Sequence, residues 1–263
     1  MNHHMKRIAE GACLLAFMAA AAGAEPQVGI VTFTVDNVTE AFFDQRMPAF
    51  FAREIPGTIF GQTQPITGAP GDMTWDDVRN LAAHGWEFGA HGYTHAYALS
   101  KASDEVLEME LGVPAAQIYV QTGIYPITFA SPNGDYDARV LERARFYYKA
   151  HFRGWGNDGI NRFDQTDHWH IYREQVPNTK SVEEVCADIE RAGREGYWLV
   201  YMWHRVVDEP TYEYENSVAQ FEGVLDCADR LRDEGIIRLV TARDALEVVP
   251  HTPRSPEPFP VQP

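Results

Sequence analysis

The sequence predicts an α/β fold in which a parallel sheet is either closed into a barrel or left open and doubly wound. Three observations lead to this prediction. Short apolar runs alternate with helical patterns from Val28 onward, and repeated βα units of this kind form parallel sheets. The length of 263 residues suits a single α/β domain. The composition, with 45% hydrophobic and 23% charged residues, suits a sizeable buried core.

The elements follow one another in a regular order along the chain. The predicted strands are Val28–Val35, Gly57–Phe60, Trp86–Ala90, Ile127–Ala130, Phe146–Ala150, Trp198–Trp203 and Ile236–Val240. The predicted helices are Glu40–Arg53, Thr74–Ala83, Asp104–Leu111, Tyr136–Arg145, Ser181–Glu195 and Ser217–Asp233. Thr74 and Ser181 each precede an acidic residue by three positions, which is typical of a capped helix start. Gly154–Pro177 is expected to be a long loop over one mouth of a barrel.

Residues 1–24 have the three parts of a secretory signal peptide. Lys6 and Arg7 precede an apolar run over residues 11–22, and Ala22-Gly23-Ala24 provides a small-x-small cleavage site. The run is too short to span a bilayer permanently. We therefore expect residues 25–250 to form one exported domain, secreted or periplasmic, with no stable membrane insertion. Residues 251–263 form a Pro-rich tail.

Charge and cysteine content narrow the partners and the compartment. A net charge of −16 argues against nucleic acid and anionic membranes as general partners. After removal of residues 1–24, Cys186 and Cys227 remain, both in amphipathic helical segments. In an oxidising compartment they could form one disulfide, and small buried thiols are the alternative. The sequence makes no prediction of the oligomeric state.

Polar residues follow the first and third predicted strands, and functional groups collect at the carboxyl ends of strands in parallel α/β folds. Asp36 and Asn37 end the first strand, where capping of the next helix is the alternative interpretation. His91 and His95 follow the third strand, and histidines spaced i and i+4 at a helical turn can bind one metal ion.

Two further strands end in the same way. Pro132-Asn133-Gly134 follows the fourth strand and forms a turn that suits either an oxyanion hole or an ordinary loop. His204 follows the strand Trp198–Trp203, where it is either a general acid or a satisfied core histidine. All these residues are expected at one end of the sheet, so we predict a single catalytic centre.

The order of these motifs resembles the polysaccharide deacetylase family, carbohydrate esterase family 4 with the NodB-homology domain. The resemblance rests on Thr34-Val35-Asp36-Asn37-Val38, His91-Gly92-Tyr93-Thr94-His95, Phe129-Ala130-Ser131-Pro132-Asn133-Gly134 and Met202-Trp203-His204. It covers nearly the whole chain after residue 24. The resemblance implies a single-domain, distorted (β/α)7-type barrel.

The resemblance also implies a role for each matched residue. Asp36 corresponds to the general base that activates water, and His204 corresponds to the general acid that protonates the leaving amine. Asn133 occupies the position whose backbone N–H holds the oxyanion. The implied ligands of a divalent metal, zinc first and cobalt or nickel as alternatives, are His91, His95 and Asn37.

The sequence departs from the family pattern at three positions, one of which is Val38 in place of a glycine. Asn37 stands where the family has an acidic metal ligand, and a neutral amide should bind a divalent cation more weakly. Sliding the motif by one residue would make Asp36 the ligand and put Val35 at the base position. Ala130 stands where many members have an Arg that orients the base. We expect Arg173 to supply that positive charge, with a solvated loop residue as the alternative.

We therefore expect an exported, metal-dependent deacetylase that hydrolyses N-acetyl groups of an amino-sugar polymer or oligomer, such as a chitin-like, poly-N-acetylglucosamine or peptidoglycan glycan. An O-acetyl esterase would use the same residues. The neutral Asn37 leaves two alternatives open, namely a non-catalytic sugar-binding barrel with a degenerate metal site and a metal-free amidase acting on a small non-sugar amide. Trp155, Trp169 and Tyr172 are expected either to stack on sugar rings or to close the barrel mouth as core.

Overall fold

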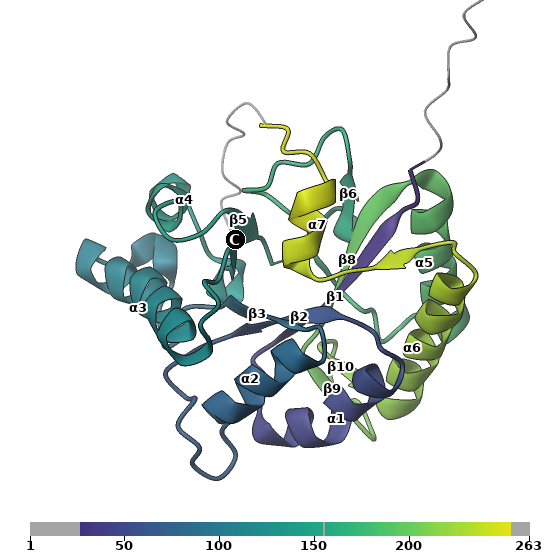
Figure 1. Ribbon diagram of the computed structural model, residues 1–263, viewed down its shortest axis with the longest axis horizontal. Coiled ribbons are helices and arrows are strands. Elements are labelled where there is room, and N and C mark those ends of the chain that lie inside the picture. The colour runs from purple at the N-terminus through teal and green to yellow at the C-terminus, as the bar shows by residue number, and fades with distance from the viewer. Residues whose placement is uncertain (1–26, 155, 254–263) are drawn as a thin grey trace, which may run out of the picture.

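A curled sheet of nine strands forms the centre of the computed structural model, which describes residues 27–154 and 156–253 (Figure 1). The hydrogen-bonded order is β5-β4-β3-β2-β1-β8-β6, with β11 beside β1 and β7 beside β8. All pairs in this sheet are parallel except β6 with β8. The strands are β1 Ile30–Asp36, β2 Gly57–Gly61, β3 Glu87–Ala90, β4 Thr128–Ala130, β5 Ala150–Phe152, β6 Ile160–Arg162, β7 Glu174–Gln175, β8 Tyr197–Trp203 and β11 Arg238–Leu239. The pair β9 Arg205–Val207 and β10 Glu215–Ser217 forms a second, two-stranded sheet.

Helices surround the curled sheet (Figure 1). They are α1 Glu40–Ala52, α2 Trp75–Ala83, α3 Asp104–Thr122, α4 Ala138–Ala144, α5 Val182–Glu195, α6 Val218–Asp233 and α7 Ala242–Val248. Thr74 and Ser181 form the predicted capping boxes at the starts of α2 and α5. The predicted single-domain α/β fold is confirmed, and the sheet has the form of a half-barrel.

Strands β1 and β8 are buried along their whole length because helices and neighbouring strands cover both faces. Phe33 of β1 contacts Phe50 of α1 and Trp203 of β8. At the amino ends of the strands, the first backbone N–H groups of α7 donate to Thr58 and Glu87. The amino end of the barrel is therefore covered, and the carboxyl ends of β1 and β8 are held in a rigid core.

The structure corrects two predicted elements. The strand predicted at Phe146–Ala150 begins only at Ala150, because residues 146–149 form the turn after α4 and the Phe146 side chain is exposed. The helix predicted to end at Leu111 continues as α3 to Thr122 through Pro114. Gly112 lets the Tyr147 ring pack closely on this part of α3, since a Cβ there would lie 3.1 Å from that ring.

The described residues of the loop predicted at Gly154–Pro177 include the short strands β6 and β7 and a one-turn 3₁₀ helix over Asn157–Gly159. Cys186 of α5 and Cys227 of α6 form a disulfide, which settles the choice between a disulfide and free thiols. In the described part of the chain, none of the helices is long and apolar enough to cross a membrane. The predicted signal peptide and residues 254–263 of the predicted tail lie outside the described residues.

Candidate active site

A cavity of about 680 Å³ opens at the carboxyl ends of the parallel strands, and all seven predicted site residues line it. Asp36 ends β1 and Asn37 follows it, and the other residues follow β3, β4 and β8 or precede β7. They are Asp36, Asn37, His91, His95, Asn133, Arg173 and His204. Because parallel strands end at one edge of the sheet, residues up to 168 positions apart in the sequence meet here.

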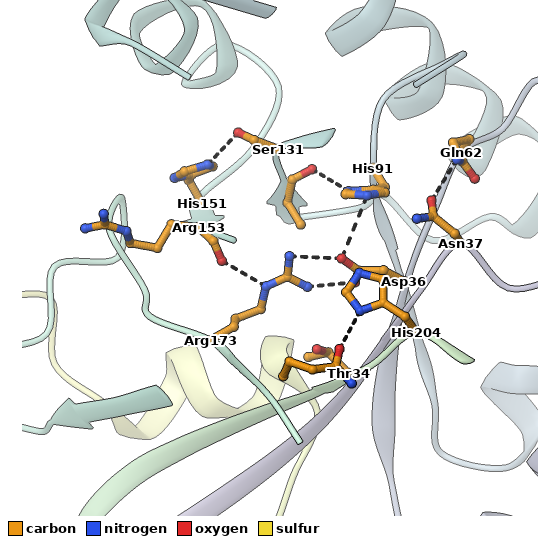
Figure 2. Close-up of polar contacts among 12 residues, drawn as sticks. Thr34, Asp36, Asn37, Gln62, His91, Ser131, His151, Arg153, Arg173 and His204 are labelled. Atoms are coloured by element: carbon orange, nitrogen blue, oxygen red, sulfur yellow. Dashed lines mark hydrogen bonds and ion pairs between the residues drawn. The ribbon is translucent and has the colours of Figure 1, made fainter. Parts of the chain in front are cut away.

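Asp36 is buried and forms a bidentate ion pair with Arg173 (Figure 2). Arg173 Nη1 donates to Asp36 Oδ1 at 2.7 Å and Nη2 donates to Oδ2 at 3.0 Å. Arg173 Nε donates to the Arg153 carbonyl at 3.0 Å, and the Arg173 side chain is 1% exposed. The guanidinium is thus fixed in one orientation against the carboxylate, and the alternative of a solvated loop residue does not hold.

The charges around Asp36 keep its carboxylate ionised. Burial alone would raise the pKa of Asp36, but the positive charge and hydrogen bonds of Arg173, together with the electrostatic interactions with His91 and His204, outweigh burial and lower the pKa to about 2. His91 Nε2 lies 3.8 Å from Asp36 Oδ2. Asp36 is therefore an anionic acceptor throughout the neutral range.

His91 has a defined tautomer. Its Nδ1 donates to the Ala130 carbonyl at 2.8 Å, so the lone pair is on Nε2, which faces Asp36 (Figure 2). Burial lowers the pKa of His91 to about 4, which keeps the ring neutral. The His95 ring lies beside the His91 ring, with a centroid distance of 4.9 Å.

The expected helical turn between His91 and His95 is not present. Residues 91–97 are irregular, and Gly92 and His95 both have left-handed backbone with φ of 81° and 60°. A side chain at position 92 would meet the buried Glu110 carboxylate at 2.9 Å. Glu110 accepts hydrogen bonds from the backbone N–H groups of Tyr93 and Thr94 and from the Thr94 hydroxyl. A buried carboxylate on α3 therefore holds the segment between the two histidines.

Asn37 lies at the cavity wall with its side chain turned toward Gln62 (Figure 2). Gln62 Nε2 donates to Asn37 Oδ1 at 2.7 Å, and Asn37 has left-handed backbone with φ of 58°. The described residues contain no group of three His, Cys, Asp or Glu side chains that could hold a metal ion. The residue that follows Asp36 at the cavity wall is thus a neutral amide rather than a second carboxylate.

His204 is oriented by a network of side-chain amides that begins at Gln175 of β7. Its Nδ1 donates to Gln175 Oε1 at 2.6 Å, and Gln175 Nε2 donates to Asn216 Oδ1 at 3.0 Å. Asn216 in turn donates to the Val176 carbonyl and to Gln220. Burial lowers the pKa of His204, and the charge of Asp36 opposes this effect. Nε2 is the nitrogen left for contact with a ligand.

Asn133 lies in a one-turn helix that follows β4, with left-handed backbone of φ 54°. This turn is connected to the loop that carries Arg173 through His151 of β5. The Ser131 hydroxyl donates to His151 Nε2 at 2.7 Å, and His151 Nδ1 donates to the Trp169 carbonyl at 2.9 Å. Burial lowers the pKa of His151 to about 3, so the imidazole remains a neutral bridge.

Sequence reasoning did not identify Gln62, Glu110, His151 or Gln175. Each contacts a predicted residue or a segment next to one through an interaction between distant parts of the chain, and none belongs to a motif. One signal was available for Glu110, because a carboxylate on the apolar face of a helix needs a buried partner.

The aromatic residues at the cavity differ from those expected. Trp169 is buried in the core under Arg145, and Trp155 lies outside the described residues. Tyr212 and Tyr214, which lie just before β10, line the cavity instead. The Tyr214 ring lies 5.6 Å from the His204 ring, centroid to centroid. Aromatic surface is therefore available beside His204.

Comparison with known sequences identifies one family. Residues 23–149 match the family described as Polysaccharide deacetylase, and this range includes Asp36, His91, His95 and Asn133 but not Arg173 or His204. No curated protein matches the chain.

Several solved structures have a similar fold. The Xyl-CE4 domain of a multidomain xylanase from the hindgut metagenome of Trinervitermes trinervoides is 13% identical, with 84% of this chain and 91% of that chain covered and a TM-score of 0.59. Peptidoglycan deacetylase PdaC from Bacillus subtilis is 16% identical, with 85% and 93% covered and a TM-score of 0.54. A CE4 family pseudoenzyme from Bacillus anthracis is 12% identical, with 86% and 67% covered and a TM-score of 0.55.

Proposed function

Because this chain belongs to the polysaccharide deacetylase family, we propose that it is an exported hydrolase that removes N-acetyl groups from an amino-sugar polymer or oligomer. Chitin-like, poly-N-acetylglucosamine and peptidoglycan glycans are the candidate substrates. The observation that supports the proposal most strongly is the meeting of Asp36, His91, His95 and His204 around one cavity. A protein that only binds sugar has no need of an ionised base and a facing histidine.

The side chains at the cavity fit a divalent cation, which in this proposal is zinc, with cobalt or nickel as alternatives. His91 offers a preset Nε2 lone pair and His95 offers a second imidazole beside it, and Asn37 would add a neutral amide oxygen after turning from Gln62. When bound, such an ion polarises an acyl carbonyl and lowers the pKa of water. The neutral third donor predicts weaker binding than a carboxylate would give.

The proposed reaction assigns two proton transfers to this chain's own residues. Asp36 accepts a proton as the water oxygen attacks the acetyl carbonyl carbon, and Arg173 keeps both carboxylate oxygens in position. In this reaction the Asn133 backbone N–H stabilises the oxyanion. The carbon–nitrogen bond then breaks, the proton on His204 Nε2 passes to the leaving amine, and acetate is released. Gln175 Oε1 accepts a hydrogen bond from His204 Nδ1 and thereby stabilises charged His204.

Export is supported by two independent features. Residues 1–24 have the composition of a signal peptide, and the Cys186–Cys227 disulfide fits an oxidising compartment.

Acetate release by substituted proteins tests the assigned residues. On N-acetylglucosamine oligomers, Asp36→Asn and His204→Ala are expected to lower kcat by about 10²- to 10⁴-fold. Asp44→Asn, which removes an exposed carboxylate from α1, serves as the matched control and should retain full activity. Full activity of either site variant would refute the assignment.

The Asn37–Gln62 contact favours one second candidate, a sugar-binding barrel without catalysis. Binding of the oligomers without acetate release, in protein supplied with Zn²⁺, would support this candidate. Release of acetate from acetylated xylan but not from the N-acetylated oligomers would instead identify an O-acetyl esterase.

A further inference from the structure

The wall of the active-site cavity has the opposite charge balance to the rest of the chain. The whole sequence has 38 Asp and Glu residues against 22 Lys and Arg residues. Among the described residues that line the cavity are three arginines, Arg46, Arg173 and Arg205, and one carboxylate, Asp36. A cavity that gathers cations in a strongly acidic protein attracts anionic ligands, since local charge rather than net charge acts at short range.

Two of the three arginines have carboxylate partners. Arg173 is paired with Asp36, and Arg205 Nη1 lies 3.1 Å from Oε1 of the buried Glu215. Arg46 differs, because none of the carboxylates in residues 27–154 or 156–253 forms an ion pair with it. Its Nε donates to the Val206 carbonyl at 3.3 Å, and it is half-buried. Arg46 is thus anchored through Nε, and its two terminal nitrogens are left for a ligand.

The anchoring contact determines where a ligand of Arg46 would lie. Val206 is two residues after His204, so Arg46 of α1 is tethered next to the proposed general acid. The Tyr214 ring also lies near the His204 ring. The centroids of the Tyr212 and Tyr214 rings are 6.0 Å apart. Tyrosine rings offer flat, amphipathic faces of the kind on which sugar rings pack.

We propose that the substrate is an acylated sugar that carries a carboxylate, and that Arg46 recognises this carboxylate. This inference rests on the proposed function, because it places the acyl group at His204 and Asp36. A planar guanidinium forms two parallel hydrogen bonds with a carboxylate, which a lysine ammonium cannot reproduce. Neutral N-acetylated sugars would occupy the same cavity without this contact and bind less tightly.

The test compares two substrates that differ only in charge. N-acetylglucosamine oligomers and the same oligomers oxidised at C6 to the carboxylate are supplied to the protein in the presence of Zn²⁺, and kcat/KM for acetate release is measured. The unsubstituted protein is expected to prefer the oxidised oligomer at least tenfold, mainly through KM. Arg46→Gln should abolish this preference, and Arg46→Lys should retain part of it.

Arg194→Gln is the matched control, because it removes an exposed arginine that pairs only with Glu190 on α5. This variant should keep the full preference. Equal kcat/KM for the two oligomers in the unsubstituted protein, or an unchanged preference in Arg46→Gln, would overturn the inference. Thermal unfolding of each variant confirms that a lost preference does not reflect loss of folding.

Failure of the proposed hydrolysis can be distinguished from failure of this inference. If neither oligomer releases acetate, calorimetry measures the binding of both to the same proteins. Tighter binding of the oxidised oligomer, lost at least tenfold in Arg46→Gln, would support the carboxylate site and refute the hydrolysis. Equal binding of the two oligomers, or no binding of either, would overturn the inference.

Discussion

Replacement of Arg173 by methionine leaves Asp36 buried without its ion-pair partner. Arg173 is 1% exposed and donates three hydrogen bonds, two to Asp36 and one to the Arg153 carbonyl. Burial favours the neutral carboxyl, and the charge of Arg173 opposes this effect most strongly. We therefore expect the pKa of Asp36 to rise when Arg173 is removed.

The cost of this substitution follows from the burial of both partners. Removing one partner of a buried ion pair typically costs about 3–5 kcal/mol, because the other charge remains desolvated. For a domain of this size, each kcal/mol lowers Tm by about 2–4 °C, so Arg173→Met should lower Tm by roughly 6–20 °C. Arg173→Lys keeps the charge and loses the bidentate geometry, and its effect should be smaller.

Thermal unfolding of a double-mutant cycle checks the reasoning. Arg173→Met, Asp36→Asn and the double variant are compared at pH 7. The double variant removes both charges, so it should be at least about 1 kcal/mol more stable than the sum of the single effects predicts. A Tm of Arg173→Met within 2 °C of the unsubstituted protein, or strictly additive effects, would refute a coupled buried pair.

Three further predictions concern the third ligand position, the disulfide and acid stability. Asn37→Asp should tighten Zn²⁺ binding, measured by competition with a chelator, and unchanged affinity would favour the shifted motif register. Replacing Cys186 and Cys227 by serine should destabilise the fold by about 4 kcal/mol, since the disulfide closes a loop with a sequence separation of 41, while acetate release below Tm is retained. The pKa of His151 is about 3 in the fold against 6.5 for an exposed imidazole, so the unfolded chain binds the extra proton. The contribution of neutral His151 to the free energy of unfolding is therefore complete above pH 6.5 and is lost as pH falls toward 3. At pH 5 the free energy of unfolding should be about 2 kcal/mol lower than above pH 6.5 for this reason. His151→Gln should reduce this loss between pH 7 and pH 5, measured by chemical denaturation, and an unaltered pH slope would contradict it.

The sequence predicted the part of the site that depends on strand ends. Asp36, His91, Asn133 and His204 each follow an apolar strand, and parallel strands bring their carboxyl ends together whatever their exact boundaries. For this reason, the error in the strand predicted at Phe146–Ala150 did not change the predicted site residues.

The interactions that orient these residues could not be predicted. Arg173 was selected for its charge alone, and its bidentate geometry depends on the path of an irregular loop. Gln175 and Glu110 reach His204 and the His91–His95 segment from other elements. A left-handed backbone at His95, rather than a helical turn, brings the two rings together. Local sequence patterns do not encode such contacts between distant segments.

The most direct test of the account combines metal analysis with acetate release. The purified protein, after removal of residues 1–24, is analysed for bound metal and assayed on N-acetylglucosamine oligomers before chelation, after chelation and after return of Zn²⁺. His95→Ala is assayed beside it. The account predicts near-stoichiometric metal and acetate release that chelation abolishes, that Zn²⁺ restores and that His95→Ala lacks. Acetate release that is unaffected by chelation and by His95→Ala, or no release even with Zn²⁺ supplied, would contradict it.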